Sequence, residues 1–189
     1  LQRALTAVVL AIFFVLATTQ ASPLVFAHIM TAIMMFVSWE WSTLAGLKAN
    51  LHKLLFVSGT FIVLVVMYFF LDILPESKEL ITERVVIILC LGSVFWFLSI
   101  FLLTSYPANL ALWNGSLKIS VSGLIVIVSA WCGVIGLKYI ADNGALVLVV
   151  VILVAVADIG AYFFGRSFGK AKLAAELSPN KTWAGVWGG

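Results

Sequence analysis

The sequence predicts an all-α, polytopic integral membrane protein, a bundle of about six transmembrane helices. First, 63% of its 189 residues are hydrophobic, only 10% are charged, and the mean hydropathy is +1.18. A soluble domain of this size would lack the polar residues needed to cover its surface. Second, the apolar residues fall into runs that approach the length needed to cross about 30 Å of hydrocarbon. Third, these runs lack the alternation of a membrane β-barrel, so we expect helices, which satisfy their own backbone groups in lipid.

The apolar runs define the expected spans in chain order. The first is the shortest and follows Arg3. Because no small-residue cleavage motif precedes a soluble domain, we interpret this run as a membrane span rather than a signal peptide. The connecting segments are short, which predicts one helical scaffold over residues 1–157 and a site segment over residues 158–189. The six predicted spans are residues 4–18, 23–44, 54–74, 81–103, 119–137 and 145–164.

Basic residues are unevenly distributed between the two sides of this six-span arrangement. With the amino terminus in the cytoplasm, eight of the eleven Lys and Arg residues lie inside and three lie outside. The three outside are Lys78, Arg84 and Lys138. This bias follows the positive-inside rule, so it places the amino terminus and residues 158–189 on the cytoplasmic face, where nucleotides are found. Trp39 and Trp41 lie near the end of a predicted span and are expected at the membrane interface.

Asp158 stands out because it lies in the last predicted span. An ionised carboxylate at the centre of a membrane helix is unfavourable by roughly 2.5–3.5 kcal/mol, and by less toward the end. A metal ion, a nearby cation or a water-filled cavity would offset that cost. If the helix continues, Asp158, Tyr162 and Arg166 share one face at spacings of four residues. The pattern indicates either a functional site or a structural pairing of Asp158 with Arg166 through Tyr162.

The glycines beside the basic residues allow two interpretations. Gly165 and Gly169 have the spacing that lets another helix approach closely. Beside Arg166 and Lys170, the same glycines would let backbone N–H groups approach a phosphate.

Ser178 and Pro179 follow and are predicted to start a helix, as its N-cap and first residue. Lys181 and Thr182 would then lie in the first helical turn, where free N–H groups favour an anion. Lys172 adds a further cation. The alternative for these basic residues is an ordinary cytoplasmic loop in contact with anionic lipid.

The remaining polar residues in apolar surroundings give no second site. Glu40 is expected to reach the interface, His28 to bond a neighbouring helix, and His52 to lie in a loop. Cys90 and Cys132 are expected as small buried apolar residues. The sequence shows no metal-ligand spacing, catalytic triad or nucleotide-binding loop of the Walker type, and no nucleic-acid partner is expected.

The carboxyl-terminal residues resemble a known family. The residues that carry the resemblance are Asp158, Ala161, Tyr162, Phe163, Gly165, Arg166, Gly169, Lys170, Leu173, Ser178, Pro179, Lys181, Thr182, Gly185, Gly188 and Gly189. Together they resemble the pattern DxxAYFxGRxxGKxxL followed by SPxKTxEGxxGG of the phosphatidate cytidylyltransferase family, also called CDP-diacylglycerol synthases. The segment Trp39-Glu40-Trp41 with Leu44-Ala45-Gly46 is similar to the same family.

Two departures from the family pattern are visible. Ala184 stands where the family has glutamate. The family motif KDxxxxxPGHGGxxDRxD does not occur, so we expect this chain to be a fragment that is inactive alone, with the rest of the family fold missing.

The resemblance implies transfer of CMP from CTP to phosphatidate, with Mg²⁺ as cofactor, in a bacterial inner membrane, and a homodimer as a partner state. It implies Asp158 as the metal ligand and, with Lys181, as a catalytic residue. The implied substrate-binding residues are Tyr162, Arg166, Lys170, Lys172, Ser178 and Thr182. Two alternatives stay open, a non-enzymatic transporter or channel subunit and a CTP-dependent lipid or polyprenol kinase.

Overall fold

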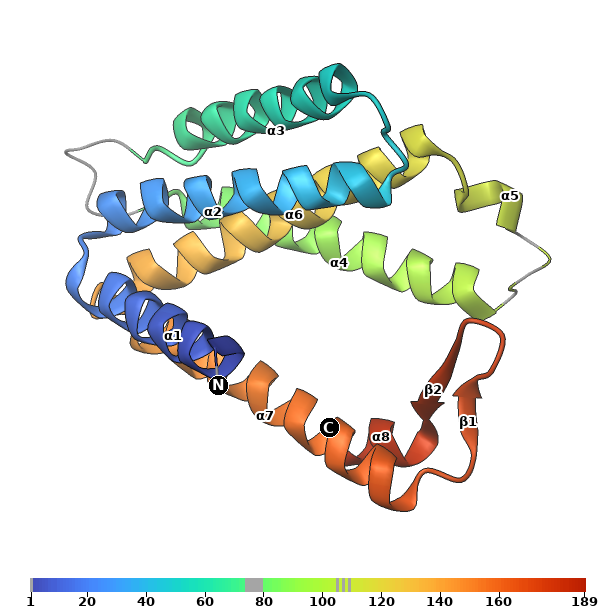
Figure 1. Cartoon of the computed structure of the whole chain (residues 1–189). Helices are drawn as coiled ribbons and strands as arrows, with labels where there is room; N and C mark the ends of the chain where they lie inside the picture. The colour runs from blue at the N-terminus through green and yellow to red at the C-terminus, as the bar shows by residue number, and fades with distance from the viewer. Residues whose placement is uncertain (1, 74–79, 105, 107, 109) are drawn as a thin grey trace. The chain divides into compact units, whose positions relative to one another are not determined.

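The computed structural model confirms a predominantly helical protein (Figure 1). It describes residues 2–73, 80–104, 106, 108 and 110–189. The chain divides into two compact units, Leu1–Ala145 and Leu146–Gly189, which are treated separately below. The described elements depart from an all-α fold only in one short β-hairpin within the second unit.

The helices agree with most of the predicted spans. The described helices are α1 (Gln2–Gln20), α2 (Pro23–Leu44), α3 (Asn50–Phe70), α4 (Thr82–Thr104), α5 (Leu110–Trp113), α6 (Ser116–Ile140), α7 (Ala145–Phe168) and α8 (Trp183–Gly188). Five of them, α2, α3, α4, α6 and α7, are long and apolar enough to cross a membrane. Helix α1 contains a shorter apolar stretch, Leu5–Gln20. The third helix begins and ends four residues earlier than predicted, and Asp72, with a φ of 61°, follows its end.

Helix α6 is the centre of the first unit and packs against α2, α3 and α4. Phe26, Leu64, Ile127 and Trp131 are almost completely buried there. The buried indole of Trp131 donates a hydrogen bond of 3.0 Å to the hydroxyl of Thr31 on α2. Large apolar side chains and one satisfied polar contact therefore hold the core of this unit.

A glycine on α6 explains how α2 approaches so closely. A Cβ added to Gly123 would overlap the indole ring of Trp41. The Trp41 indole donates a hydrogen bond of 2.8 Å to the backbone oxygen of Ile119, also on α6. Trp41 is therefore a helix–helix contact near the end of α2, and its place at the membrane interface stays a prediction.

Lys138 was predicted just past the span of residues 119–137, but α6 extends beyond it. It lies in the last turn of α6 and its side chain is completely buried. The ammonium donates a hydrogen bond of 2.7 Å to the backbone oxygen of Thr18 at the end of α1, and a second to the backbone oxygen of Asp142. Lys138 thus joins α1 to the end of α6. Lys78, which was also counted outside, lies outside the described residues.

The second unit consists of α7, a β-hairpin and α8. Strand β1 (Lys172–Ala174) pairs antiparallel with β2 (Ser178–Thr182), with Lys172 opposite Thr182 and Ala174 opposite Ser178. The register shifts between these two pairs. Helix α7 extends to Phe168, as the shared face of Asp158, Tyr162 and Arg166 requires.

The predicted helix start at Ser178-Pro179 was wrong. Both residues lie in β2, and α8 begins five residues later. Thr182 is the N-cap instead, and its hydroxyl accepts a hydrogen bond of 3.2 Å from the backbone N–H of Gly185. Pro179 is tolerated in β2 because a strand of a two-stranded ribbon has an edge that needs no backbone donor.

Candidate functional site

Helix α8 packs against α7 through glycines on both helices. A Cβ added to Gly160 of α7 would overlap the backbone oxygen of Gly188. A Cβ added to Gly185 would lie 3.0 Å from the backbone oxygen of Ala161 and 3.5 Å from the Cα of Gly165. Of the two interpretations of the Gly165–Gly169 pair, the close approach of another segment is the one that these contacts support, since Gly169 borders Thr182 in the same way.

This packing leaves a cleft of about 770 Å³ beside α7. All four elements of the second unit contribute to it, so residues that are far apart in the sequence face one volume. The lining residues are Ala161, Tyr162, Gly165, Arg166, Leu173, Asn180, Lys181, Thr182, Gly185 and Val186. Four of the predicted site residues, Tyr162, Arg166, Lys181 and Thr182, are therefore brought together.

The polar side of the cleft is cationic. The guanidinium of Arg166 donates a hydrogen bond of 2.8 Å to the Tyr162 hydroxyl one turn earlier on α7. This bond orients the guanidinium and leaves its other N–H groups for a ligand. Lys181 of β2 supplies a second cation, and no carboxylate is among the described lining residues. Two cations without an acid favour an anionic ligand, and the planar guanidinium suits a phosphate.

Thr182 and Asn180 complete the polar lining. The Thr182 hydroxyl already accepts the N–H of Gly185, and the residue is 6% exposed, so the hydroxyl has mainly a structural role. Asn180 is exposed in β2 and offers both a donor and an acceptor. The sequence prediction missed Asn180. A predicted hairpin turn between Ala174 and Ser178 would have pointed to Asn180, because strand β2 brings every residue from Asn180 to Thr182 to the cleft.

The other predicted site residues lie outside the lining. Lys170 is exposed in the segment that connects α7 to the hairpin, Lys172 is exposed at the start of β1, and Ser178 is half-buried opposite Ala174. Ala184, at the position where the family has glutamate, lies in the first turn of α8.

Asp158 is exposed on α7, four residues before Tyr162. Within the described part of the chain, no hydrogen bond or ion pair joins its carboxylate to another residue. The predicted structural pairing of Asp158 with Arg166 through Tyr162 is thus present only in its Arg166–Tyr162 half.

The carboxylate of Asp158 is a single potential metal ligand. Among the described residues, no group of three or more His, Cys, Asp or Glu side chains could hold a metal ion. Mg²⁺ does not require such a group, because it is commonly bound by one or two carboxylates together with water and substrate phosphates. One exposed carboxylate near a cationic cleft fits that mode of binding and does not fit a cage formed by protein alone.

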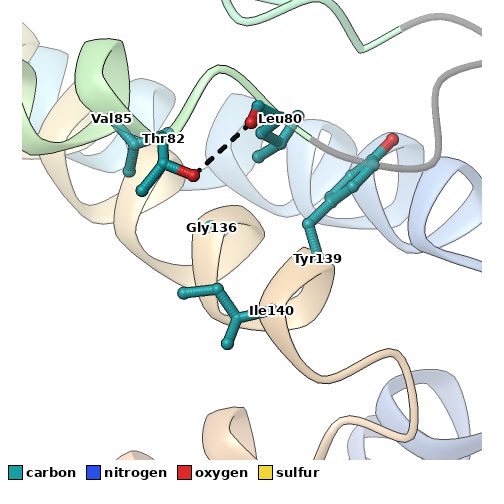
Figure 2. Close-up of a pocket in the computed structure, with 6 residues that line it drawn as sticks. All are labelled: Leu80, Thr82, Val85, Gly136, Tyr139 and Ile140. Atoms are coloured by element: carbon teal, nitrogen blue, oxygen red, sulfur yellow. Dashed lines mark hydrogen bonds between the residues drawn. The ribbon is translucent and has the colours of Figure 1, made fainter.

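A small pocket of about 230 Å³ in the first unit offers less chemistry (Figure 2). It lies between the start of α4 and the end of α6, with Gly136 among its lining residues. Its polar groups are the hydroxyls of Tyr139 and Thr82, and Thr82 bonds the backbone oxygen of Leu80 at 3.5 Å. With no charged lining side chain among the described residues, this pocket is a poor candidate for binding a nucleotide.

Comparison with known proteins decides the family. A family model described as "Cytidylyltransferase family" matches residues 1–189. The chain belongs to the cytidylyltransferase family. The match covers the helical first unit as well as the second unit with the cationic cleft.

Curated relatives support this assignment. A phosphatidate cytidylyltransferase of Pseudomonas aeruginosa is 34% identical over 164 residues, 87% of this chain and 56% of the relative. A phosphatidate cytidylyltransferase of Haemophilus influenzae is 37% identical over an alignment of 203 residues, all of this chain and 68% of the relative. One from Brucella suis is 62% identical over 32 residues. The chain thus spans about half to two thirds of the length of the first two relatives, and no solved structure matches it.

Proposed function

We propose that the complete protein transfers CMP from CTP to phosphatidate, producing CDP-diacylglycerol and pyrophosphate, and that the cleft binds a phosphate group of these substrates. Membership of the family and the names of the two relatives support the reaction. The observation that carries the proposal for the cleft is the convergence of Arg166 and Lys181 on a volume without a lining carboxylate.

The reaction itself explains why cations are needed. A phosphate oxygen of phosphatidate attacks the α-phosphorus of CTP, a new P–O bond forms, and the bond to pyrophosphate breaks. Both reactants are anions, so fixed positive charge must offset their repulsion and stabilise the charge of the transition state. Phosphoryl transfers generally depend on positioning and charge stabilisation more than on covalent help from the protein.

Each cleft residue has a role that follows from its position. Arg166, oriented by Tyr162, would bind two phosphate oxygens through its planar fork. Lys181 would act as a point charge on the same group, and we retain it as the catalytic cation. Asn180 would bond a ligand oxygen or amine, and Thr182 would hold α8 in place.

The residues outside the lining have indirect roles in this proposal. Lys170 and Lys172 would attract anionic headgroups to the mouth of the cleft, an effect that extends over about a Debye length, roughly 8 Å at physiological salt. Ser178 would support the hairpin, in place of the substrate contact predicted for it. Asp158 would hold Mg²⁺ together with substrate phosphates and water, and the bound ion would add positive charge where phosphoryl oxygens accumulate negative charge.

The protein is an integral membrane protein, and the finer placement is part of the proposal. We place the amino terminus and the cleft on the cytoplasmic side of a bacterial inner membrane, supported by the excess of basic residues predicted there. The acyl chains of phosphatidate would stay in the bilayer. A homodimer stays a prediction, which the mass of the particle in lipid nanodiscs would check.

Labelled nucleotide distinguishes the proposed reaction from its rivals. The complete protein is incubated with phosphatidate and CTP labelled at the α-phosphorus. We expect the label to enter the lipid fraction, with release of one pyrophosphate per labelled lipid. Release of CDP with transfer of the γ-phosphate would indicate a lipid kinase. No turnover, together with solute flux in proteoliposomes, would favour the transporter.

Asp158→Asn tests the assignment of the metal. If Asp158 holds Mg²⁺, the variant should need a higher Mg²⁺ concentration and lose about 10- to 100-fold in activity, as when a metal site loses a supporting group. Direct binding of Mn²⁺, followed by its paramagnetic resonance signal, gives a second measurement that does not depend on turnover. Unchanged Mg²⁺ dependence and Mn²⁺ binding would remove Asp158 from the site.

A further inference from the structure

A third hollow, separate from the cationic cleft and from the small α4–α6 pocket, lies between α2 and α3. These two antiparallel helices pack side by side in the first unit (Figure 1). The groove between them has a volume of about 610 Å³ and an apolar lining interrupted by three polar side chains. The lining residues are Leu24, His28, Thr31, Ala32, Met35, Phe61, Val65, Tyr68, Phe69 and Ile73.

The hydrogen atoms of Thr31 and Tyr68 can be assigned from their partners. The Thr31 hydroxyl donates to the backbone oxygen of Ala27 at 2.8 Å and accepts from the Trp131 indole at 3.0 Å. Its single proton is therefore used, so the Tyr68 hydroxyl, 3.2 Å away, must donate to Thr31. The phenol proton of Tyr68 is directed at Thr31, and the lone pairs of the phenol oxygen are left as acceptors.

The proton of His28 can be assigned from its hydrogen-bond partner in the same way. Its Nδ1 lies 2.7 Å from the backbone oxygen of Leu24, which can only accept, so Nδ1 carries the proton. In the neutral imidazole, Nε2 is then an acceptor. The His28 and Tyr68 rings are neighbours, with centroids 5.5 Å apart. Two hydrogen-bond acceptors thus lie together in the groove, and no donor of these three side chains is left over.

The two ends of the groove differ in polarity. His28, Thr31 and Tyr68 lie toward the start of α2 and the end of α3, whereas Met35 and Phe61 lie deeper along the same helices. From Leu24 to Met35 the groove follows α2 for about 16 Å at the rise of an α-helix, roughly half of the hydrocarbon thickness. The described lining contains no Lys, Arg, Asp or Glu side chain.

These features define the chemistry of an occupant. Two acceptors require a hydrogen-bond donor, which hydrocarbon chains and ester carbonyls do not supply. An anionic headgroup would meet two electron-rich acceptors and no cation, so burying it there is unfavourable. A neutral lipid with a free hydroxyl satisfies both conditions, with its hydroxyl at His28 and Tyr68 and an acyl chain extending toward Met35 and Phe61.

We propose that the α2–α3 groove is a binding site for a neutral, hydroxyl-bearing glycerolipid of the diacylglycerol type, taken up from the surrounding bilayer. The proposal concerns a site other than the cleft of the second unit and does not depend on the proposed function. It predicts selectivity against phosphatidate, the anionic lipid that the proposed reaction would consume.

Photo-crosslinking in lipid nanodiscs tests the proposal without any turnover. The complete protein is reconstituted in phosphatidylcholine with one of three probes of identical acyl chains, each with a diazirine near the glycerol. The probes are diacylglycerol, its 3-O-methyl ether and phosphatidate. We expect diacylglycerol to label peptides that cover residues 24–35 and 61–73, and the ether to label them about fivefold less, the effect of one net hydrogen bond.

Two variants test whether crosslinking of diacylglycerol depends on the acceptors of His28 and Tyr68. His28→Leu and Tyr68→Phe should each reduce diacylglycerol labelling of the groove severalfold and leave the weak ether labelling unchanged. His52→Leu, in the first turn of α3, is the matched control and should label like the parent. Among the described residues, the one hydrogen bond of His28 is to Leu24 of its own helix and not to a neighbouring helix as predicted, so His28→Leu keeps the test valid if Tyr68→Phe does not fold.

Four results would overturn the proposal. Equal labelling by diacylglycerol and its ether would show that the hydroxyl is not recognised. Labelling of the groove by phosphatidate at the level of diacylglycerol would contradict selection against charge. Absence of probe from the groove, or crosslinks from a photoreactive residue at Ala32 to another protein segment, would show that protein covers this face.

Discussion

The two units of the molecule are stabilised by different kinds of contact. In the first unit, bulky side chains such as Phe26 and Trp131 fill the space between helices. In the second unit, α7 and α8 meet through Gly160, Gly185 and Gly188, so backbone atoms form the contact. A backbone contact leaves neighbouring side chains free to face a ligand, whereas a side-chain core uses them for stability. In the second unit, side chains beside this backbone contact line the cationic cleft.

Gly160→Ala tests this comparison with the largest expected effect. The added methyl would overlap the backbone oxygen of Gly188, and a backbone oxygen cannot rotate away as a side chain can. We expect α8 to separate from α7 at a cost of about 3 kcal/mol, the upper part of the usual range for overpacking. Hydrogen exchange of the Gly185 and Gly189 amides measures this loss.

Gly59→Ala is the matched control for that experiment. Gly59 also lies within a helix, but a Cβ there meets no atom within 4 Å. This variant should keep the exchange rates of the parent, or become slightly more stable, because alanine favours a helix by about 1 kcal/mol. Equal effects of the two substitutions would contradict the assignment of α8 packing to glycine contacts.

Arg166→Ala should reduce activity without affecting the first unit. Loss of a hydrogen bond to a charged group costs about 1.5–3 kcal/mol, which corresponds to about a 10- to 150-fold loss in kcat/KM. Arg166→Lys should recover part of it, since the charge stays but the planar fork is lost.

Lys172→Ala removes a cation outside the cleft lining and is the control for Arg166→Ala. We expect less than about a twofold change in kcat/KM at physiological salt, because an exposed charge is screened. Initial rates at several CTP concentrations separate the two variants. Similar losses for both would favour a diffuse positive surface over a defined phosphate site.

Gly123→Ala carries the comparison into the first unit, with a smaller expected effect than Gly160→Ala. The new methyl would overlap the Trp41 side chain, which can move, but the indole would then lose its bond to the backbone oxygen of Ile119. We expect a loss of about 1–2 kcal/mol in stability. Thermal unfolding in lipid, followed by tryptophan fluorescence, measures it, and a loss larger than that of Gly160→Ala would reverse the comparison.

Apart from the two control variants, Thr182→Val has the smallest expected effect. It removes the side-chain oxygen that accepts the Gly185 N–H and should destabilise the start of α8 by about 1 kcal/mol. Thr182→Ser keeps the oxygen and should restore protection of the Gly185 amide against exchange. Failure of serine to restore protection would assign the effect to lost packing of the threonine methyl.

Sequence patterns predicted the apolar helices well because a membrane span must be long, apolar and internally hydrogen-bonded. The dipeptide Ser-Pro shows the limit of such patterns, because it starts a helix at one position and lies in a strand at another. Ser22-Pro23 starts α2, with the Ser22 hydroxyl accepting from Val25, whereas Ser178-Pro179 lies in a strand. Pro23 precedes a long apolar run, and Pro179 precedes three polar residues and a helix of only six residues.

The candidate site was predictable in part for a related reason. Tyr162 and Arg166 share a helix face, so a spacing of four residues was enough to place them together. Lys181 and Asn180 reach the cleft only because a hairpin turns the chain back, and pairing between strands depends on contacts that local periodicity does not contain. Residue type suggested Lys181, and nothing comparable indicated Asn180.

The bond from Lys138 to Thr18 joins residues that are 120 positions apart. During synthesis the end of α1 leaves the ribosome long before Lys138 does, so its carbonyl must wait for α6 before it gains this partner. On a ribosome stalled before residue 138, α1 would therefore lack its hydrogen bond to α6. On a ribosome stalled well after residue 138, α1 could already have formed that bond. The order of synthesis thus sets the earliest moment at which α1 can form its hydrogen bond to Lys138.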